Sequence, residues 1–431
     1  MKLDEQAELL NRKIQSANPA VLEMLSERGK AIFFPKLGVL SQSADAAGKD
    51  INATIGIALE DDASAMRLPC IERNIALPPA SVFTYAPSPG RPDIRALWKE
   101  MLARKNPSLA GKSISSPMVT QALTHGLSIC GYLFCDKGDR LIMPDLYWEN
   151  YDLVFGNAYG GRLDLFPTFV KNRFNAAGLR KKLLAGKPGK KIVCLNFPNN
   201  PSGFTPTGAE ADAIAAACLE AAEAGVRVVA LIDDAYFGLV FEDSVIRESM
   251  FARLCDLHPN LLAIKLDGPT KEDYVWGFRV GFLTFGVRGG TPELYAALEA
   301  KASGAIRGNI SNCSNLSQSL LVKAWSSPDY EREKRMKFET LKARYMKVKA
   351  ILASHPEYCE HFEPLPFNSG YFMCIRLKKA DPECLRKKLL AEYSTGVIVL
   401  SGVVRIAFSA TPMNKLERLF DNLYRAAKEL A

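Results

Sequence analysis

Five polar residues stand just beyond short apolar runs in the middle of the sequence, and their types suit one kind of chemistry. In chain order they are Asn200, Asp233, Tyr236, Lys271 and Arg279. A lysine with a lowered pKa can form a Schiff base with an aldehyde, and an aspartate can pair with a protonated ring nitrogen that withdraws electrons. An asparagine and a tyrosine can bind a phenolate oxygen, and an arginine can hold a phosphate through two parallel hydrogen bonds. Together these groups describe a site for pyridoxal phosphate.

Short apolar runs alternate with amphipathic segments through the middle of the chain, and this alternation predicts how the polar residues are positioned. We expect four buried strands, at 140–144, 191–196, 227–233 and 261–266, and helices that include 208–224 and 246–257. Strands that alternate with helices are typical of an α/β fold with a mainly parallel sheet. Because ligands bind beyond the carboxyl ends of such strands, the five polar residues are expected to meet there.

A long helix is predicted from about Ser327, where a serine is followed by proline and acidic residues. Apolar residues then recur every three or four positions and form one buried stripe, made of Phe338, Leu341, Tyr345, Val348 and Leu352. We expect this helix to lead from a large domain into a smaller C-terminal one. The first ~65 residues are expected to fold back onto the smaller domain, since a chain of this length suits two domains.

Composition and charge exclude several classes of function. The chain has 431 residues, and its 55 basic and 47 acidic residues leave a net charge of +8, a mild excess for this length. The densest basic stretch, 332–349, also carries acidic residues, so we interpret it as a solvated helix face rather than a nucleic-acid surface. The four histidines show no metal-ligand spacing, which predicts that there is no metal site.

Cysteine usage and hydropathy predict a cytoplasmic protein. The ten cysteines include no CxxC pair, and several lie in apolar runs, as free thiols do in a reducing compartment. The first residues lack the apolar core of a signal peptide. No run approaches the ~18 uncharged apolar residues that a membrane helix needs. We therefore expect neither a membrane nor a nucleic acid as a partner.

The motifs and their order resemble those of the class I aminotransferases, which are pyridoxal-phosphate enzymes of fold type I, and most closely the aspartate and aromatic aminotransferase branch. The family's Asn-Pro-Thr-Gly corresponds to Asn-Pro-Ser-Gly at 200–203, and its Asp-x-Ala-Tyr corresponds to 233–236. Its lysine stands eight residues before an arginine, as Lys271 does before Arg279. Spacings of 33 and 38 residues separate the asparagine, the aspartate and the lysine. The resemblance runs from about residue 51 to residue 405.

The resemblance implies a fold and a reaction. The fold is α/β, with a large domain (66–325) that holds a mainly parallel sheet of the seven-stranded type covered by helices on both faces. A smaller α+β domain would combine the two chain ends, 1–65 and 326–431. The reaction would move an amino group between an L-amino acid (aspartate, glutamate or aromatic) and a 2-oxo acid. Lys271 would hold the cofactor and move the Cα proton as general base and acid.

Further matches imply how the cofactor is bound. Leu123, through its backbone, and Thr124 lie in a segment that resembles the turn opening a helix against the cofactor phosphate, and amides at a helix N-terminus suit a dianion. Trp148 is expected to stack on the pyridine ring, with Tyr147 as the alternative. Tyr85 resembles the tyrosine that reaches the phosphate of the neighbouring subunit, which implies a homodimer.

Other matches concern the substrate. Arg405 resembles the arginine that binds the substrate α-carboxylate, Gly56 resembles the glycine beneath the substrate, and Asn200 is expected to contact both substrate and cofactor. Arg307 lies in a segment similar to one that donates an arginine for the distal carboxylate across the dimer. It would select aspartate, glutamate or 2-oxoglutarate, without excluding aromatic substrates.

The sequence also departs from the family pattern. Gly268 stands three residues before the lysine, where the family often has a phosphate-binding serine, so Thr270 is expected to supply that hydroxyl. Cys313 and Ser314 replace the two prolines that usually follow the loop of the distal arginine. The stretch before Arg405 is shorter than usual.

Alternatives exist for the lysine and for the activity. Lys265 is a rival to Lys271, but it lies inside an apolar strand with the wrong spacing to Arg279. Asp234 is expected to be structural, because neighbouring strand residues point to opposite faces. A lyase or decarboxylase on the same fold is the main alternative, since the motifs hold the cofactor and do not choose the reaction. A DNA-binding regulator is a further alternative, but the residues before 51 resemble the family's own N-terminal arm.

Overall fold

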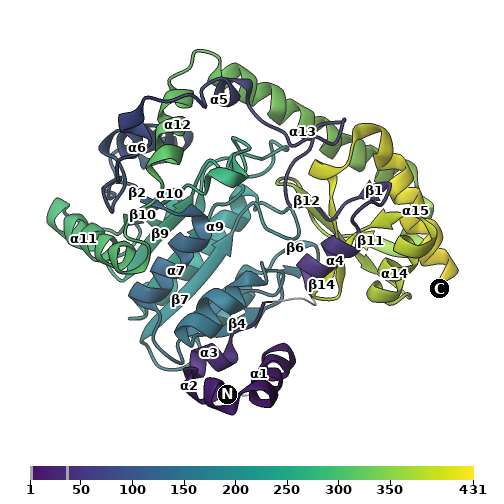
Figure 1. Ribbon diagram of the computed structural model, residues 1–431, viewed down its shortest axis with the longest axis horizontal. Helices are drawn as coiled ribbons and strands as arrows, with labels where there is room; N and C mark the ends of the chain where they lie inside the picture. The colour runs from purple at the N-terminus through teal and green to yellow at the C-terminus, as the bar shows by residue number, and fades with distance from the viewer. Residues whose placement is uncertain (1–2, 35–37) are drawn as a thin grey trace.

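The apolar runs in the middle of the chain form one seven-stranded sheet in the computed structural model, which describes residues 3–34 and 38–431 (Figure 1). Its strand order is β2-β10-β9-β8-β7-β3-β4, and neighbouring strands are parallel except where β10 pairs with β2 and β9. The strands are β2 (Met118–Thr120), β3 (Arg140–Pro144), β4 (Arg162–Phe166), β7 (Lys190–Asn196), β8 (Arg227–Asp233), β9 (Leu261–Asp267) and β10 (Gly281–Gly286). The central strands β7, β8 and β9 are almost entirely buried, as strands covered by helices on both faces are.

The strands lie where the sequence predicts them, with small shifts at their ends. β3 and β8 have the predicted bounds, β7 begins one residue earlier and β9 ends one residue later. Helix α9 (Gly208–Glu223) also matches its prediction closely. The helix predicted over 246–257 is wrong in extent, because α10 spans only Met250–Leu254. Ser249 fixes its start as the N-cap, accepting a hydrogen bond from the Phe251 amide at 3.0 Å.

Helices cover both faces of the sheet. Helices α7 (Ala122–Phe134) and α11 (Pro292–Asn309) pack on one face, and α8 (Ala176–Leu184), α9 and α10 pack on the other (Figure 1). A hydrophobic core lies between the sheet and the helices on each face. Successive residues of β8 contribute alternately to these two cores, since side chains along a strand alternate between faces. The carboxyl ends of the parallel strands stay open between the two helical layers.

The C-terminal part of the chain forms a second, antiparallel sheet with the order β11-β12-β15-β14. Its strands are β11 (Phe362–Pro364), β12 (Phe372–Leu377), β14 (Ile398–Leu400) and β15 (Val403–Ala407), and helices α14 (Pro382–Glu392) and α15 (Leu416–Glu429) pack against it. The long helix α13 (Tyr330–Ser354) joins the two parts (Figure 1). It begins three residues later than predicted, and its expected apolar stripe contributes to the core.

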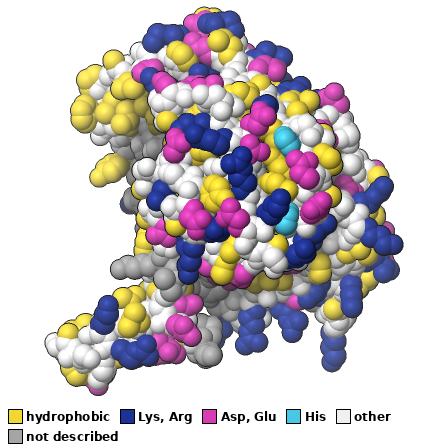
Figure 2. Space-filling model, turned by 90° about the vertical axis from the view of Figure 1, so that its right-hand side faces the viewer, with side chains coloured by type: hydrophobic (Ala, Val, Ile, Leu, Met, Phe, Trp, Pro, Cys, Tyr) yellow, Lys and Arg dark blue, Asp and Glu magenta, His cyan; other side chains and the backbone are white. Residues whose placement is uncertain are grey.

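The N-terminal residues divide into two groups. Helix α4 (Val39–Asp45) and strand β1 (Ile51–Asn52) pack with the smaller sheet, where β1 pairs with β13 (Thr395–Gly396). Helices α1 (Glu5–Ala17), α2 (Pro19–Met24) and α3 (Glu27–Ala31) instead lie together beside the large sheet, and Figure 2 shows a lobe projecting from the body at this level. The expected domain boundaries at residues 65 and 325 stay a prediction.

Two surface properties bear on the classes of partner. The face that Figure 2 shows mixes basic and acidic side chains, and ion pairs such as Lys388–Glu429 and Lys347–Glu417 join the helices on that side. Within residues 3–34 and 38–431, no helix is both long enough and apolar enough to cross a bilayer.

The turn after β7 meets the smaller sheet so closely that only glycine fits there. Gly203 has a φ of +72°, and a Cβ on it would lie 1.9 Å from the carbonyl oxygen of Phe372. Its own carbonyl accepts hydrogen bonds from the amides of Asn368 and Ser369, both at 2.9 Å.

We predict that Gly203→Ala lowers the free energy of unfolding by about 3 kcal/mol, because a strained φ and a backbone clash add together. Chemical denaturation followed by circular dichroism measures this. Gly208→Ala is the matched control, since a Cβ there has nothing within 4 Å and Gly208 begins α9. It is expected to raise stability by up to about 1 kcal/mol. Equal effects of the two substitutions would contradict the prediction.

Candidate active site

A pocket with a cavity volume of about 180 Å³ lies at the carboxyl ends of β7, β8 and β9. Nine residues predicted from the sequence line it: Leu123, Thr124, Trp148, Asn200, Asp233, Tyr236, Thr270, Lys271 and Arg279. Sequence reasoning missed three further lining residues, Ala122, Asn196 and Ala235. Ala122 is the first residue of α7, Asn196 is the last residue of β7, and Ala235 lies two residues after the end of β8, and these positions are the signal that could have found them. The five polar residues therefore meet at the expected edge of the sheet.

Asp233 is the last residue of β8, and its side chain is buried. The Tyr151 hydroxyl donates to its Oδ2 at 2.5 Å, and the Ala235 amide donates to Oδ1 at 3.1 Å. Burial raises the pKa of this carboxyl, and the two hydrogen bonds and the Lys271 ammonium oppose that rise. The carboxylate is thus held in place with Oδ2 and Oδ1 both engaged. Tyr151 carried no sequence signal, because a different part of the chain brings it to this strand.

Lys271 lies in the turn that follows β9. Its ammonium is 5.2 Å from the centroid of the Tyr236 ring. Burial lowers the pKa of this amine to about 8, and the positive charges of Arg279 and Arg405 lower it while Asp233 raises it. An amine of this pKa is partly neutral near neutral pH, which is the form that acts as nucleophile or base.

The rival Lys265 lies on the other face of the sheet. It is fully buried in β9, where its ammonium contacts the carboxylate of Asp234 and lies 3.2 Å from Asp267. It does not line the pocket. Asp234 accordingly points away from Asp233, as the alternation of strand side chains predicts.

One end of the pocket is rich in hydrogen-bond donors. Helix α7 begins there at Ala122, whose φ is +62°, and the first amides of a helix have no partner within it. The Thr270 hydroxyl, which donates to the Val280 carbonyl at 3.3 Å, and the exposed Arg279 lie on the same rim. Amides at a helix N-terminus together with a guanidinium form an anion site.

Gly268 leaves no space for the serine that the family often has. A Cβ at this position would lie 2.9 Å from the Val280 carbonyl oxygen and 3.3 Å from the Leu123 side chain. The close packing of this turn against the start of α7 therefore explains the glycine. Thr270 is the hydroxyl residue of this turn that reaches the pocket.

Trp148 rather than Tyr147 lines the pocket. The Trp148 ring meets Tyr151 edge to face, with centroids 5.7 Å apart, which orients both rings beside Asp233. Tyr147 turns toward Asp152 and donates to it at 2.9 Å.

Arg405 is buried in β15 of the smaller sheet and lies next to this pocket. It donates to Asn200 Oδ1 at 3.2 Å and to the Thr54 carbonyl at 3.3 Å. Its Nε has no hydrogen-bond partner among the described residues. A second cleft, lined by Arg405, Trp148 and residues of the N-terminal helices, opens beside it. The Asn200 side chain thus connects the arginine to the first pocket.

Comparison with known proteins identifies the family. The model of the family "Aminotransferase class I and II" matches residues 55–423. The chain belongs to this family. The aminotransferase is 24% identical over 358 residues to the aspartate aminotransferase of Bacillus sp. strain YM-2, covering 80% of this chain and 84% of that protein. It is 25% identical over 205 residues to a probable N-acetyl-LL-diaminopimelate aminotransferase of Bacillus subtilis, covering 47% and 48% of the two chains.

Solved structures share the fold of this aminotransferase. An aminotransferase from Anaerococcus prevotii superposes with a TM-score of 0.82 at 21% identity, covering 93% of this chain and 98% of the other. The aspartate aminotransferase of Thermus thermophilus with maleate gives a TM-score of 0.72 at 18% identity, covering 93% and 99%. The prediction of fold type I is confirmed, and the chain is a pyridoxal-phosphate-dependent aminotransferase.

The residues of the pocket fit this cofactor. The donors at the start of α7, with Thr270 and Arg279, suit its phosphate, and the buried Asp233 suits its ring nitrogen. The Lys271 amine suits its aldehyde. Across the described part of the chain, no cluster of three His, Cys, Asp or Glu side chains could hold a metal ion.

Besides Arg405, three predicted residues lie outside this pocket. Tyr85 is 90% exposed, and Arg307 is exposed on the last turn of α11, where it donates to the Ser311 hydroxyl at 2.8 Å. Gly56 is exposed, and a Cβ there would have nothing within 4 Å. Near Arg307, the replaced proline position Cys313 is buried, with its thiol 3.4 Å from the Val119 carbonyl.

We predict that Lys271 is acylated more readily than the buried Lys265 in the cofactor-free chain, with half of its amines neutral at pH about 8, compared with ~10.4 for an ordinary lysine. Competitive acetylation across pH, read by peptide mass spectrometry, measures this. Asp233→Asn is expected to lower the Lys271 pKa further, because a carboxylate stabilises the ammonium. Lys265 serves as the control and is expected to stay unreactive. A Lys271 titration near pH 10.4 would contradict the prediction.

Proposed function

We propose that this aminotransferase holds its cofactor through Lys271 as a Schiff base and exchanges the amino group of aspartate, glutamate or an aromatic amino acid with a 2-oxo acid. One observation carries the assignment of the lysine. The Lys271 amine, with its pKa lowered to about 8, lies in the same pocket as Asp233 and the donor-rich start of α7. The names of the aspartate aminotransferases among its relatives support the substrate class.

When bound, the cofactor supplies an aldehyde that condenses with amines and a ring that accepts electrons released at the substrate Cα. Lys271 Nζ, partly neutral at its lowered pKa, accepts the proton from the substrate Cα and later returns a proton. Asp233 presents a buried carboxylate to a protonated ring nitrogen, and its hydrogen bond from Tyr151 favours the charged form. Asn200 and Tyr236, which both line the pocket, would hold the ring oxygen.

The remaining pocket residues orient the cofactor. The backbone of Leu123, the side chains of Thr124 and Thr270, and the Arg279 guanidinium bind the phosphate. Trp148 stacks on the ring, and its edge-to-face contact with Tyr151 supports this orientation. All of these residues line the same pocket.

Arg405 binds the substrate α-carboxylate. It is buried, and its Nε lacks a partner among the described residues, so it can donate to an incoming carboxylate. The contact with Asn200 Oδ1 at 3.2 Å keeps the guanidinium next to the cofactor pocket. Gly56 leaves open space beneath the substrate.

The active form is a cytoplasmic homodimer in which Tyr85 and Arg307 complete the neighbouring site. Both side chains are exposed and lie outside the pocket of their own chain. Phe83, two residues from Tyr85, is 84% exposed, and exposed aromatic residues are frequent at interfaces between subunits. Tyr85 would bind the phosphate and Arg307 the distal carboxylate of the substrate.

We predict that borohydride treatment of the holoenzyme labels Lys271 and leaves Lys265 unlabelled, because only Lys271 reaches the pocket. Peptide mass spectrometry locates the label. Lys271→Ala is expected to lose the label, the visible absorbance band of the cofactor and amino transfer together. A label on any other lysine would remove the basis of the proposed function.

A coupled assay separates amino transfer from the lyase alternative. With aspartate and 2-oxoglutarate, the expected products are oxaloacetate and glutamate in equal amounts. Pyruvate and ammonia formed from one amino acid without a 2-oxo acid would indicate a lyase instead.

We predict that two inactive variants, Lys271→Ala and Arg307→Gln, complement each other when their subunits are mixed. Each hybrid dimer has one site with both substitutions and one intact site, so random mixing restores about a quarter of wild-type activity with aspartate. The assay follows activity after reversible dissociation and reassembly. Lys271→Ala mixed with Arg405→Gln is the control and is expected to restore nothing, since both residues belong to the same chain's site. Absence of complementation with Arg307→Gln would exclude a shared site.

A further inference from the structure

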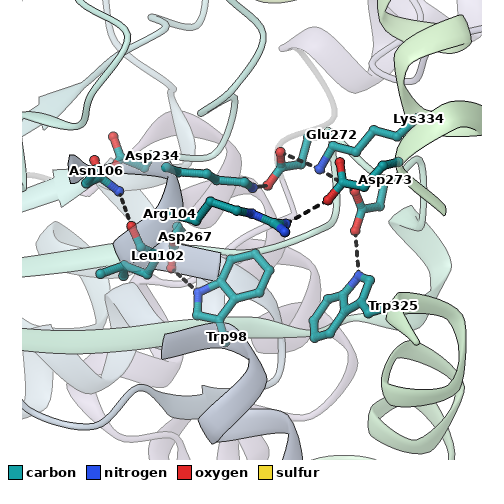
Figure 3. A network of polar contacts seen from close by, with 12 residues as sticks. Trp98, Leu102, Arg104, Asn106, Asp234, Asp267, Glu272, Asp273, Trp325 and Lys334 are labelled. Carbon is teal, nitrogen blue, oxygen red and sulfur yellow. Dashed lines mark hydrogen bonds and ion pairs between the residues drawn. The ribbon is translucent and has the colours of Figure 1, made fainter. Parts of the chain in front are cut away.

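Each of the two residues at the centre of the pocket is followed in sequence by a buried carboxylate that points away from the pocket. Asp234 follows Asp233, and Glu272 and Asp273 follow Lys271. These three carboxylates are only 2%, 5% and 0% exposed, in that order. Glu272 and Asp273 share the ammonium of Lys334 (Figure 3), and Asp234 contacts that of Lys265. Burying a charged group costs free energy unless it is paired. The cations that pair with these three carboxylates are therefore part of what holds the two segments in place.

The two carboxylates after Lys271 are held from two helices. Glu272 contacts the ammonium of Lys105, at the end of α6 (Pro92–Lys105), and lies 2.7 Å from that of Lys334 on α13. Asp273 lies 2.8 Å from Lys334 (Figure 3). Two carboxylates and two ammonium groups thus balance in charge. Burial alone would raise the pKa of Glu272, but the two lysines hold it well below its usual value.

Asp273 receives two further hydrogen bonds from neutral donors. The Tyr330 hydroxyl at the start of α13 donates to it at 2.8 Å. The indole of Trp325, at the end of α12 (Asn315–Trp325), donates at 2.9 Å (Figure 3). Both oxygens of Asp273 are therefore engaged, and three helices converge on the residue pair that follows Lys271.

The turn itself is fixed by its backbone. The Asp273 amide donates to the Pro269 carbonyl at 2.9 Å, and the Val275 amide donates to the Thr270 carbonyl at 3.2 Å. From the smaller sheet, the Tyr371 hydroxyl donates to the Lys271 carbonyl at 2.6 Å. The side chain of Lys271 leaves this turn toward the pocket while Glu272 and Asp273 leave it toward α13.

We propose that Glu272 and Asp273, held by Lys105 and Lys334, form a clamp that fixes the Lys271 turn to α13, and that Lys334 is a positioning residue for the Lys271 amine. The inference rests on the proposed role of Lys271. Lys334 is suited to this task because, among the described residues, it is the one cation that pairs with both carboxylates. Helix α13 leads into the sheet that bears Arg405, so the clamp sets the position of the amine relative to the carboxylate-binding arginine.

The clamp influences the pKa of Lys271 by keeping its amine in a fixed, partly desolvated environment. Asp233 and Tyr236 from the end of β8, Arg279 from the rim and Arg405 from β15 face Lys271. Burial is the largest cause of its lowered pKa. A turn released from α13 would let water reach the amine, and its pKa would return toward that of an ordinary lysine.

The same helix carries a matched control. Tyr330 and Lys334 are four residues apart and bind Asp273, and Tyr345 and Lys349 are four residues apart and bind Glu242. Lys349 lies 3.2 Å from Glu242, which is not part of the Lys271 turn and does not line the pocket. Equivalent substitutions in the two pairs each remove a tyrosine hydrogen bond or a lysine ion pair from α13, but the Lys349–Glu242 pair is more exposed and does not adjoin Lys271.

The test measures the pKa of Lys271 by competitive acetylation of the cofactor-free, full-length chain. In Lys334→Met we expect the pKa of Lys271 to rise by about 1, and in Tyr330→Phe we expect a smaller rise of the same pKa. Lys334→Arg keeps the charge and is expected to recover most of the shift. Lys349→Met and Tyr345→Phe are expected to leave the Lys271 pKa unchanged, although they also lower the unfolding temperature.

Tyr330→Phe keeps every ion pair of the clamp, so it remains informative if Lys334→Met fails to fold after losing a buried cation. The inference is overturned if both clamp variants lower stability while the Lys271 pKa stays at its wild-type value, as in the controls. Borohydride labelling of the wild-type holoenzyme tests the proposed function separately. A missing label at Lys271 would overturn that function, and the pKa shifts would still report on the clamp.

Discussion

The burial of one amine at the edge of a parallel sheet is the constraint on which the site depends. The turn after β9 holds Lys271 half-buried in the pocket, and desolvation is the largest cause of its lowered pKa. A lysine in water is protonated at neutral pH and is neither a nucleophile nor a base. The surrounding charges then adjust the value, with Asp233 opposing the arginines. Packing around the amine therefore makes the largest contribution to the lowered pKa of Lys271, and the neighbouring charges make smaller ones.

The Lys271 amine stays partly shielded from water only if the segments that carry it are held in place, and buried ion pairs outside the pocket hold them. Asp233 and Lys271 face the pocket, while Asp234, Glu272 and Asp273 face the other way into a network of buried ion pairs. Removing one partner of a buried pair leaves an uncompensated charge that costs several kcal/mol. The residues that bear the chemistry and the residues that hold them in place are thus neighbours in sequence whose side chains point in different directions.

The site is assembled from segments that lie far apart in sequence. The start of α7, the ends of β7 to β9 and the strand β15 of the smaller sheet all contribute, and Asn200 joins Arg405 to the cofactor pocket through one hydrogen bond. Glycines permit the close approaches that this needs, at Gly203 against Phe372 and at Gly268 against the start of α7. Specificity for an acidic substrate, in our proposal, is supplied by Arg307, an exposed residue that acts in the neighbouring site.

The sequence by itself determined which elements form and which residues could do the chemistry. Apolar runs that end in Asn, Asp and Lys predict strands and the edge where their side chains meet, because the ends of parallel strands lie together whatever the details of packing. Tertiary structure alone decided that Tyr151 binds Asp233, that Trp148 rather than Tyr147 reaches the pocket, that α10 is short and that Lys334 holds the Lys271 turn. These outcomes depend on contacts between segments tens to hundreds of residues apart, and such contacts leave no periodicity in a single sequence.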